Sequence, residues 1–251
     1  MSDVIRIAQV TDCHLPADPK QAYRGIDPYK NLKTLLQKVK SLKPDLMLAT
    51  GDLSEDGSLA SYLALRKLFS RIGAPVLALP GNHDDAALLA QVFPGSPVDA
   101  VSVTDHGGWQ IIRLNSCLPG KPYGRISEVS VAGLKNVLQR DAGRPRLLAI
   151  HHQPLVSGSP WIDKYRLFEP DALLQIVDHY TDIKAVVWGH IHQVFEALRN
   201  GTVMLGSPSS AINGLPGAEK FTPDRCGPAC RWLELKMDGA VRTEIVLVKS
   251  T

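Results

Sequence analysis

Five short polar segments of this chain each follow an apolar run, and Gly51-Asp52 shows the pattern most clearly. The run 46–50 stops at a glycine and then presents the carboxylate of Asp52. Short apolar runs bounded by a breaker predict buried strands, so Asp52 is expected at the carboxyl end of a strand, where open α/β sheets bind ligands. An unpaired charge there is costly, so Asp52 needs a buried cation, a helix N-cap role or a metal.

Four further apolar runs end in polar side chains in the same way. The residues that follow them are Asp12 and His14 after run 4–10, Asn82, His83 and Asp84 after run 75–79, His151 and His152 after run 146–150, and His190 and His192 after run 185–188. Each has an ordinary explanation alone, since Asp12 could cap a helix and His14 could be a hydrogen-bonded core imidazole. Because parallel strands bring their carboxyl ends to one edge of a sheet, we expect all five segments to lie together there.

The side chains gathered in this way have the donor chemistry of a transition-metal site. Two carboxylates, one amide oxygen and four imidazoles, without thiolate, suit Mn, Fe, Co or Zn better than Ca or a structural zinc site. One ion cannot use seven protein ligands. Two ions about 3.5–4 Å apart can do so if one carboxylate bridges them, and such pairs catalyse in-line displacement at phosphorus.

The elements that must hold these segments alternate between strands and helices. Asp27-Pro28 supplies an N-cap and a first-turn proline, and apolar residues then recur at helical spacing until Pro44. Similar patterns predict helices over 59–72, around 88–89, over 130–140 and over 171–180, and strands with a turn over 98–115. Asn200-Gly201 and Asp238-Gly239 predict two hairpins.

The length of the chain and the composition of its last part predict its domain organisation. We expect one α/β domain over residues 1–251. Residues 206–230 form a Gly-, Pro- and Ser-rich loop that is too long for a simple connection, which indicates a functional role. With the final hairpin, residues 206–251 are a candidate cap over the site or a candidate homodimer contact.

Composition and charge narrow the class of protein. The formal charge of +3 is spread along the chain without a basic block, so we expect no nucleic-acid partner. The start shows no signal-peptide pattern, and no apolar run approaches the roughly 20 residues of a membrane span, so we expect a cytoplasmic protein without membrane contact. The four cysteines suit reduced thiols; Cys226 and Cys230 could pair, but free thiols are favoured.

Five motifs carry a resemblance to a known family. They read D-x-H at Asp12 and His14, G-D-x-x-x-D-G from Gly51 to Gly57, G-N-H-D from Gly81 to Asp84, H-H at His151 and His152, and G-H-x-H from Gly189 to His192. In order and spacing they resemble the calcineurin-like metallophosphoesterase family. Within that family the chain looks most like the bacterial class III cyclic nucleotide phosphodiesterases.

The resemblance implies a two-sheet β-sandwich flanked by helices and a role for each motif residue. It implies that one metal ion is held by Asp12, His14, Asp52 and His192, and the other by Asp52, Asn82, His151 and His190, with Asp52 as the bridge. It assigns His83 to the substrate phosphate or leaving oxygen, and Asp84 to orienting the His83 imidazole. Asn82 would also face the substrate, while His152 stays open between a substrate contact and a structural role.

One departure from the family bears on the substrate. The protein serine/threonine phosphatase branch reads G-D-x-x-D-R-G, with an arginine that binds a phosphomonoester dianion, whereas residues 51–57 contain no arginine. This favours a diester, above all a 3′,5′-cyclic nucleotide such as cAMP. We expect Arg24 and the 206–230 loop to recognise it, with Phe221 either stacking on a base or packing under its loop.

Charge considerations predict the mechanism. Two metal ions acidify a bridging water, and the resulting hydroxide attacks phosphorus in line while the ions neutralise the phosphoryl oxygens. His83 is the expected proton donor to the leaving alkoxide. Other phosphoesters stay open, namely a glycerophosphodiester, a 2′,3′-cyclic nucleotide, a nucleotide-linked lipid or a phosphomonoester. A nuclease is less favoured because no basic stripe is present, and a non-catalytic scaffold because every ligand position is filled.

Overall fold

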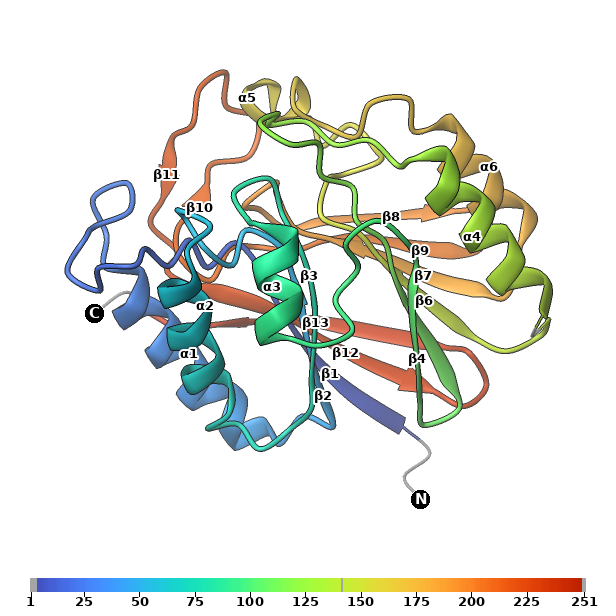
Figure 1. Cartoon of the computed structure of the whole chain (residues 1–251), viewed down its shortest axis with the longest axis horizontal. Helices are drawn as coiled ribbons and strands as arrows, with labels where there is room; N and C mark the ends of the chain where they lie inside the picture. Colours follow the sequence, from blue (N-terminus) through green and yellow to red (C-terminus); the bar gives the residue numbers. More distant parts are fainter. Residues whose placement is uncertain (1–3, 141, 250–251) are drawn as a thin grey trace.

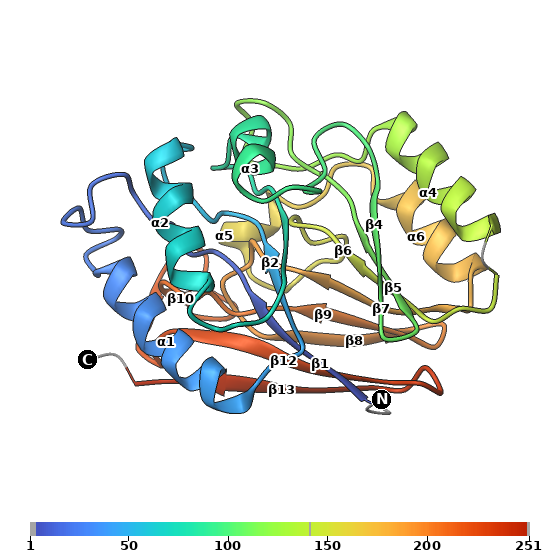
Figure 2. The ribbon, with the colours of Figure 1, turned by 60° about the horizontal axis from the view of Figure 1, so that its bottom comes forward.

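Two β-sheets lie face to face between two layers of helices in the computed structural model, which describes residues 4–140 and 142–249 (Figure 1, Figure 2). Helices α1, α2 and α3 cover one sheet, and α4 and α6 cover the other (Figure 2). The predicted β-sandwich flanked by helices is confirmed.

The first sheet contains strands from both ends of the chain. Its order is β13 (Val241–Leu247), β12 (Ala229–Lys236), β1 (Val4–Val10), β2 (Leu46–Thr50) and β3 (Val76–Leu79). Strands β1, β2 and β3 run parallel, whereas β12 pairs antiparallel with both β1 and β13. The carboxyl ends of β1, β2 and β3 therefore lie at the same edge of this sheet.

The second sheet has a parallel centre and two antiparallel edges. Its order is β4 (Ser102–His106), β5 (Trp109–Arg113), β6 (Arg146–Ala149), β7 (Ile183–Trp188), β9 (Thr202–Gly206) and β8 (Phe195–Arg199). Strands β5, β6, β7 and β9 run parallel. The carboxyl ends of β6 and β7, which precede the histidine motifs, are therefore neighbours.

Several helices start and stop at residues that local chemistry predicts. They are α1 (Pro28–Leu42), α2 (Leu59–Phe69), α3 (Ala86–Val92), α4 (Glu128–Arg140), α5 (Pro160–Asp163) and α6 (Asp171–His179). The Asp27 side chain accepts from the Lys30 N–H at the start of α1, and Lys43 ends that helix in a left-handed conformation just before Pro44. The long predicted helices are confirmed to within about a turn, whereas α5 was not predicted.

Alternating side chains of the strands fill two different layers of core. On β1, Ile5 and Ile7 face the second sheet, while Ala8 and Val10 pack under the helices. The layer between the sheets is built from strand residues alone, including Leu48, Leu147 and Val187 in other strands. Each large aliphatic side chain buried in this way contributes about 1.5–3 kcal/mol. The layer between the sheets therefore stabilises their face-to-face packing.

The final hairpin is part of the first sheet rather than an appendage to it. Both predicted hairpins are confirmed, with Asn200-Gly201 between β8 and β9 and Asp238-Gly239 between β12 and β13. Strand β12 pairs with β1 from Val4 to Gln9. The 206–230 loop contains a short ladder of β10 (Asn213–Gly214) with β11 (Pro223–Asp224).

Two further expectations concern cysteines and membranes. All four cysteines are free thiols, so Cys226 and Cys230 do not pair. Within residues 4–140 and 142–249, every helix is too short or too polar to cross a lipid bilayer.

Candidate metal centre and active site

The five predicted segments meet, but they come from two sheets. The segments after β1, β2 and β3 carry Asp12, Asp52 and Asn82, and those after β6 and β7 carry His151 and His190. The prediction that all five segments share one sheet edge is wrong. Parallel strands bring together only the carboxyl ends of their own sheet. The stacking of the two sheets then brings both edges together.

The first cluster of donors lies where β1 and β7 end. His192 Nε2 lies 3.3 Å from Asp12 Oδ1 and 3.2 Å from His14 Nε2. Donor atoms of these three residues all lie within 4.8 Å of one another. His14 Nε2 also lies 3.8 Å from Asp52 Oδ2, so Asp52 borders this cluster.

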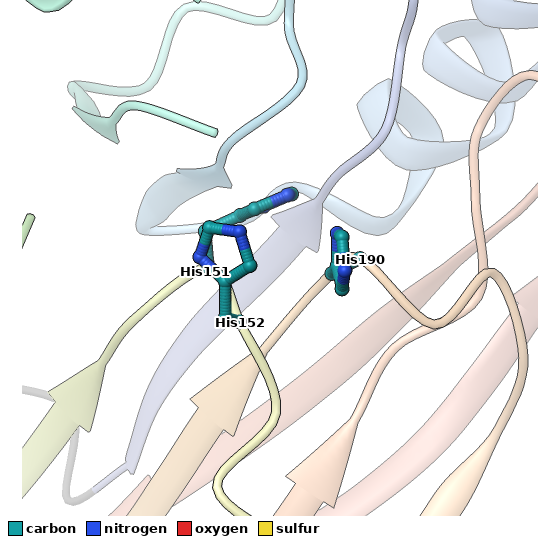
Figure 3. A group of neighbouring side chains, drawn as sticks. All are labelled: His151, His152 and His190. Atoms are coloured by element: carbon teal, nitrogen blue, oxygen red, sulfur yellow. The ribbon is translucent and has the colours of Figure 1, made fainter. Parts of the chain in front are cut away.

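The second cluster lies on the other side of Asp52. Asp52 Oδ2 is 3.4 Å from His151 Nε2, and the His151 ring centroid is 5.0 Å from that of His190. Figure 3 shows His151 and His152 on the chain leaving one strand, beside His190 at the end of the neighbouring strand. Asn82 Oδ1 and His151 Nε2 are buried without hydrogen-bond partners in the described part of the chain. Buried polar atoms normally have partners, so this donor set fits a cation.

Each of the four imidazoles predicted as metal ligands has one ring nitrogen already engaged. The contacts are His14 Nδ1 to Glu55 Oε2 at 2.7 Å, His151 Nδ1 to the Thr50 carbonyl at 2.8 Å, His192 Nδ1 to the Ile212 carbonyl at 2.7 Å, and His190 Nε2 to the Tyr165 carbonyl at 3.1 Å. Such contacts make the engaged nitrogen the N–H donor and leave the other nitrogen as a lone-pair ligand. The imidazoles are therefore oriented as metal ligands would be.

The backbone is strained at the same residues. Nine non-glycine residues among those described have positive φ, and five are Asp12, His14, Asp52, His190 and His192, with φ between 45° and 67°. Each such conformation costs on the order of 1–3 kcal/mol and persists only where the surroundings impose it, which is typical of functional sites. A Cβ at Gly81 would collide with the Asp52 backbone nitrogen, so the loops after β2 and β3 approach this closely only with glycine.

The carboxylates and imidazoles of the site shift one another's pKa values. Burial alone raises the pKa of Asp52, but the facing histidines, His151 first, hold that pKa well below its usual range. Burial opposes a charge on His151, yet the Asp52 carboxylate raises its pKa to about 9, so a metal ion would bind there in place of a proton. Burial and neighbouring imidazoles keep the pKa of His190 well below its usual range. His190 is therefore a neutral lone-pair donor, the form that binds metal.

Asp84 anchors two loops. Its carboxylate accepts hydrogen bonds from Tyr62 Oη at 3.0 Å and from the backbone N–H groups of Leu53, Ser54 and Gly81 at 3.1, 2.9 and 2.8 Å. Burial and the nearby Asp52 charge raise the pKa of Asp84 to about 6, while these hydrogen bonds work against that rise. Asp84 thus ties the loop after β3 to the loop after β2.

His83 faces a different acid from the one predicted. Its Nδ1 lies 3.4 Å from the Glu55 backbone carbonyl and 3.3 Å from Glu55 Oε2, and its backbone N–H donates to Asp52 Oδ1 at 2.9 Å. The Asp84 oxygens accept instead from Tyr62 Oη and from backbone N–H groups, so these contacts do not support the prediction that Asp84 orients the His83 imidazole. Sequence analysis missed Glu55, although it lies within the G-D-x-x-x-D-G segment.

His152 is buried beside His151 and His190 and does not line the cavity, and its Nε2 has no hydrogen-bond partner in the described part of the chain. Its side chain is fully buried, and Nδ1 lies 2.8 Å from Ser116 Oγ. Its ring centroid is 4.5 Å from that of His190, in the tri-histidine cluster of Figure 3. The expectation of a direct substrate contact is therefore not met, and the structural alternative agrees with this position.

A cavity of about 320 Å³ opens in front of the donors. Arg24 and Phe221, both predicted, line it together, with the guanidinium carbon 4.1 Å from the ring centroid. Trp161, Lys164 and Tyr165 line it as well and were not predicted. They lie in and just after α5, a single turn without an amphipathic period, so the only sequence signal was an aromatic pair beside a Gly-Ser-Pro stretch.

A helix-flanked sandwich with buried carboxylate and imidazole clusters at its meeting edges defines the architecture of a metallophosphoesterase. The family model for calcineurin-like phosphoesterases matches residues 5–194, and the chain belongs to that family.

The similarity to named relatives covers nearly the whole chain. The chain is 35% identical to the 3′,5′-cyclic adenosine monophosphate phosphodiesterase CpdA of Pseudomonas aeruginosa, over 96% of this chain and 89% of the relative. It is 35% identical to a 3′,5′-cyclic-nucleotide phosphodiesterase of Nostoc, over 96% and 91%. Among solved structures, a dimetal phosphatase from Danio rerio has a TM-score of 0.68 at 11% identity, covering 98% of this chain and 99% of that one. That last likeness shows the fold alone.

Proposed function

We propose that this protein is a dinuclear-metal phosphodiesterase that hydrolyses a small phosphodiester, with a 3′,5′-cyclic nucleotide such as cAMP as its substrate. The observation that carries the proposal is the convergence of six carboxylate and imidazole donors from the strand ends of two sheets, with Asn82 lining the same cavity and one nitrogen of each imidazole already engaged. The relatives from Pseudomonas aeruginosa and Nostoc support the substrate class, because both are named as cyclic-nucleotide phosphodiesterases.

Two sets of residues would hold the ions. Asp52 is common to both, and the sets are Asp12, His14, Asp52 and His192 for one ion, and Asp52, Asn82, His151 and His190 for the other. When bound, two such ions neutralise the phosphoryl oxygens and acidify a water that attacks phosphorus. Mn, Fe and Zn all suit these nitrogen and oxygen donors.

The His83 side chain, which lies in front of the proposed metal ligands, acts on the leaving group. His83 lines the cavity, and its backbone is held against the shared carboxylate of Asp52. A phosphate placed at Asp52 therefore lies beside the His83 imidazole, which protonates the departing oxygen. Asp84 supports this arrangement by fixing the loop that carries His83.

The cavity suits a nucleotide. Its volume of about 320 Å³ falls in the range of small-ligand sites, and it offers the aromatic ring of Phe221 for stacking and the guanidinium of Arg24 for an anion. We assign Arg24 and Phe221 to substrate binding on this basis. Lys164 at the rim adds positive charge.

A hydrolysis panel with added Mn²⁺ tests the proposal. The substrates are 3′,5′-cyclic AMP, 2′,3′-cyclic AMP, a glycerophosphodiester, an aryl diester and an aryl monoester. We expect the largest kcat/KM for 3′,5′-cyclic AMP and no turnover after chelation, with metal analysis of the same sample giving two ions per chain. A monoester preferred over every diester would contradict the diester assignment, and full activity in metal-free protein would overturn the metal mechanism.

A further inference from the structure

We infer that Arg24 makes the cavity selective for nucleotides over uncharged nucleosides, because its guanidinium covers the Phe221 ring until an anionic phosphate draws it away. The inference rests on the proposed function in placing a base on Phe221 and a phosphate at Asp52. It adds that the two residues assigned to substrate binding occupy each other's binding surface in the free protein.

Arg24 lies over a face of the Phe221 ring. The guanidinium carbon is 4.1 Å from the ring centroid, which is well within the range of a cation–π contact. A base stacked on this face of Phe221 needs the space that the guanidinium fills, since stacked planar groups lie at a similar separation. The base and the guanidinium therefore exclude each other from this face.

Phe221 also contacts neighbours that are buried. The Trp161 ring meets the Phe221 ring edge to face, with centroids 5.0 Å apart, and Trp161 is only 8% exposed. Gly214 comes so close that a Cβ there would lie 3.4 Å from Phe221 Cε2. Arg24, in contrast, is an exposed side chain with several rotatable bonds. A ligand therefore gains access to the ring by moving Arg24 rather than Trp161.

Arg24 is held over the ring by contacts that begin at a proposed metal ligand. Its Nε donates to Tyr23 Oη at 3.0 Å, and the Tyr23 ring stacks on the His14 ring with centroids 4.1 Å apart. Asp52, where the phosphate is proposed to bind, lines the same cavity as Arg24. The terminal guanidinium nitrogens suit phosphoryl oxygens, and such charge-assisted contacts are stronger than an exposed cation–π contact. A phosphate in the cavity therefore competes with Phe221 for the guanidinium.

Space beside the cavity lets the guanidinium move. A second cavity of about 250 Å³ adjoins the first, and Tyr23, Arg24 and His83 line both. The Arg24 side chain can therefore turn away from Phe221 without displacing a buried side chain.

This exchange has opposite consequences for two classes of ligand. A nucleotide breaks the contact between Arg24 and Phe221 but gains a contact between the guanidinium and its phosphate. A nucleoside breaks the same contact and gains nothing from the guanidinium. Arg24 should therefore strengthen the binding of nucleotides and weaken the binding of nucleosides.

Calorimetric titration of Mn²⁺-loaded protein with adenosine and with 5′-AMP tests the exchange. The two ligands share base and sugar, and 5′-AMP is the product expected from 3′,5′-cyclic AMP. Arg24→Ala should weaken the binding of 5′-AMP by about tenfold or more, the usual loss of a hydrogen bond to a charged group. The same variant should tighten the binding of adenosine by about 2–5-fold, the equivalent of one exposed cation–π contact.

Further variants control for folding and for the role of the Phe221 ring. Arg125→Ala removes a guanidinium that lies 5.9 Å from the Phe168 ring, away from the cavity, and should change neither affinity. Arg24→Lys keeps the positive charge, so it should retain more of the 5′-AMP affinity than Arg24→Ala does. In a Phe221→Leu background, Arg24→Ala should no longer tighten adenosine, because no ring is left to uncover.

The sign of the adenosine effect decides the inference. An unchanged or weakened adenosine affinity in folded Arg24→Ala would overturn it, because the guanidinium would then not obstruct the ring. Tightening that persists in the Phe221→Leu background would overturn it as well. If wild-type protein bound 5′-AMP but hydrolysed no ester of the panel, the proposed function would be wrong and the affinities would still decide the role of Arg24. Wild-type protein that bound neither ligand would contradict both.

Discussion

The two sheets contribute chemically different halves of one site. The sheet of β1, β2 and β3 supplies both carboxylates, Asp12 and Asp52, together with His14 and Asn82, while the sheet of β6 and β7 supplies imidazoles alone. Contacts between the two sheets pair a carboxylate with an imidazole, at 3.3 Å for Asp12 with His192 and 3.4 Å for Asp52 with His151. Electrostatic complementarity therefore supports the sandwich at the point where it would otherwise bury unpaired charge.

The halves also differ in how firmly they are held. His151, His190 and His192 have backbone carbonyls as their second partners, whereas His14 relies on the partly exposed Glu55. The three histidines of the second sheet are thus oriented by the main chain, whereas His14 of the first sheet is oriented by a side chain. Substitutions in the imidazole half should disturb metal binding, and those in the carboxylate half, which carries His83, should disturb metal binding and substrate chemistry together.

The largest expected effect comes from the carboxylate shared between the halves. Asp52→Asn should lower kcat/KM by about 10⁴-fold, because it weakens both ions and removes several kcal/mol of charge stabilisation. Steady-state kinetics at low Mn²⁺ and elemental analysis check this. Asp178→Asn, at a partly exposed pair with Arg199 outside the site, is the matched control. Near-normal metal content and turnover in Asp52→Asn would contradict the bridging role.

His83 belongs to the carboxylate half but would not bind metal. His83→Ala should slow hydrolysis of esters with poor leaving groups, such as ribose hydroxyls, by about 10²–10⁴-fold, the range for a positioned acid. An aryl diester should lose much less, because phenolate leaves without protonation, and bound metal should be unchanged. Rates on both esters and metal content are measured in the same variant. Loss of metal with equal slowing of both esters would make His83 a ligand instead.

A substitution confined to the imidazole half sharpens the contrast. His192→Ala should weaken one ion by about 100-fold or more, since even contacts behind the ligands are worth 10–100-fold, and leave the second ion bound. Mn²⁺ titration measures the two affinities separately. Excess Mn²⁺ should restore much of the activity. Equal weakening of both ions would show that the two sites cannot be separated.

Substrate recognition should depend on the cavity wall rather than on either half. Phe221→Ala should raise KM for cyclic AMP by about 5–150-fold, the equivalent of one base–aromatic stack, with little change in kcat. Phe168→Ala removes a ring that is 53% exposed and does not line the cavity, so it serves as the control. An unchanged KM would mean that Phe221 packs under its loop and binds no base.

The smallest expected effect concerns the buried connection between the halves. Gln9 Nε2 donates to Thr50 Oγ1 at 3.0 Å and to the Trp188 carbonyl at 3.1 Å, and Ser207 Oγ donates to Gln9 Oε1 at 2.7 Å. Gln9→Leu should lower the free energy of unfolding of metal-free protein by about 1–3 kcal/mol, because it leaves buried polar groups unpaired. Urea denaturation measures this, with exposed Gln91→Leu as the control. Equal stability of the two variants would contradict a structural role for Gln9.

Several features were determined by the sequence because they depend on neighbouring residues. The cap at Asp27, the stop before Pro44 and the hairpins at Asn200-Gly201 and Asp238-Gly239 follow from backbone preferences that act over a few positions. The polar segments after the strands were predictable for the same reason. An apolar run ends where the chain leaves the core, so the polar side chains that follow it lie at the end of the strand.

Other features were decided only by the tertiary structure. No local signal indicates that β12 pairs with β1, that the ligand segments come from two sheets, or that Glu55 rather than Asp84 faces His83. These contacts join residues far apart in the chain, and they depend on how the sheets stack and how the loops turn. Asp84 and Glu55 are both acidic and both close to His83 in space, yet the backbone N–H groups around Asp84 use its oxygens first. Competition for hydrogen-bond donors in the folded chain therefore decides which carboxylate reaches the imidazole.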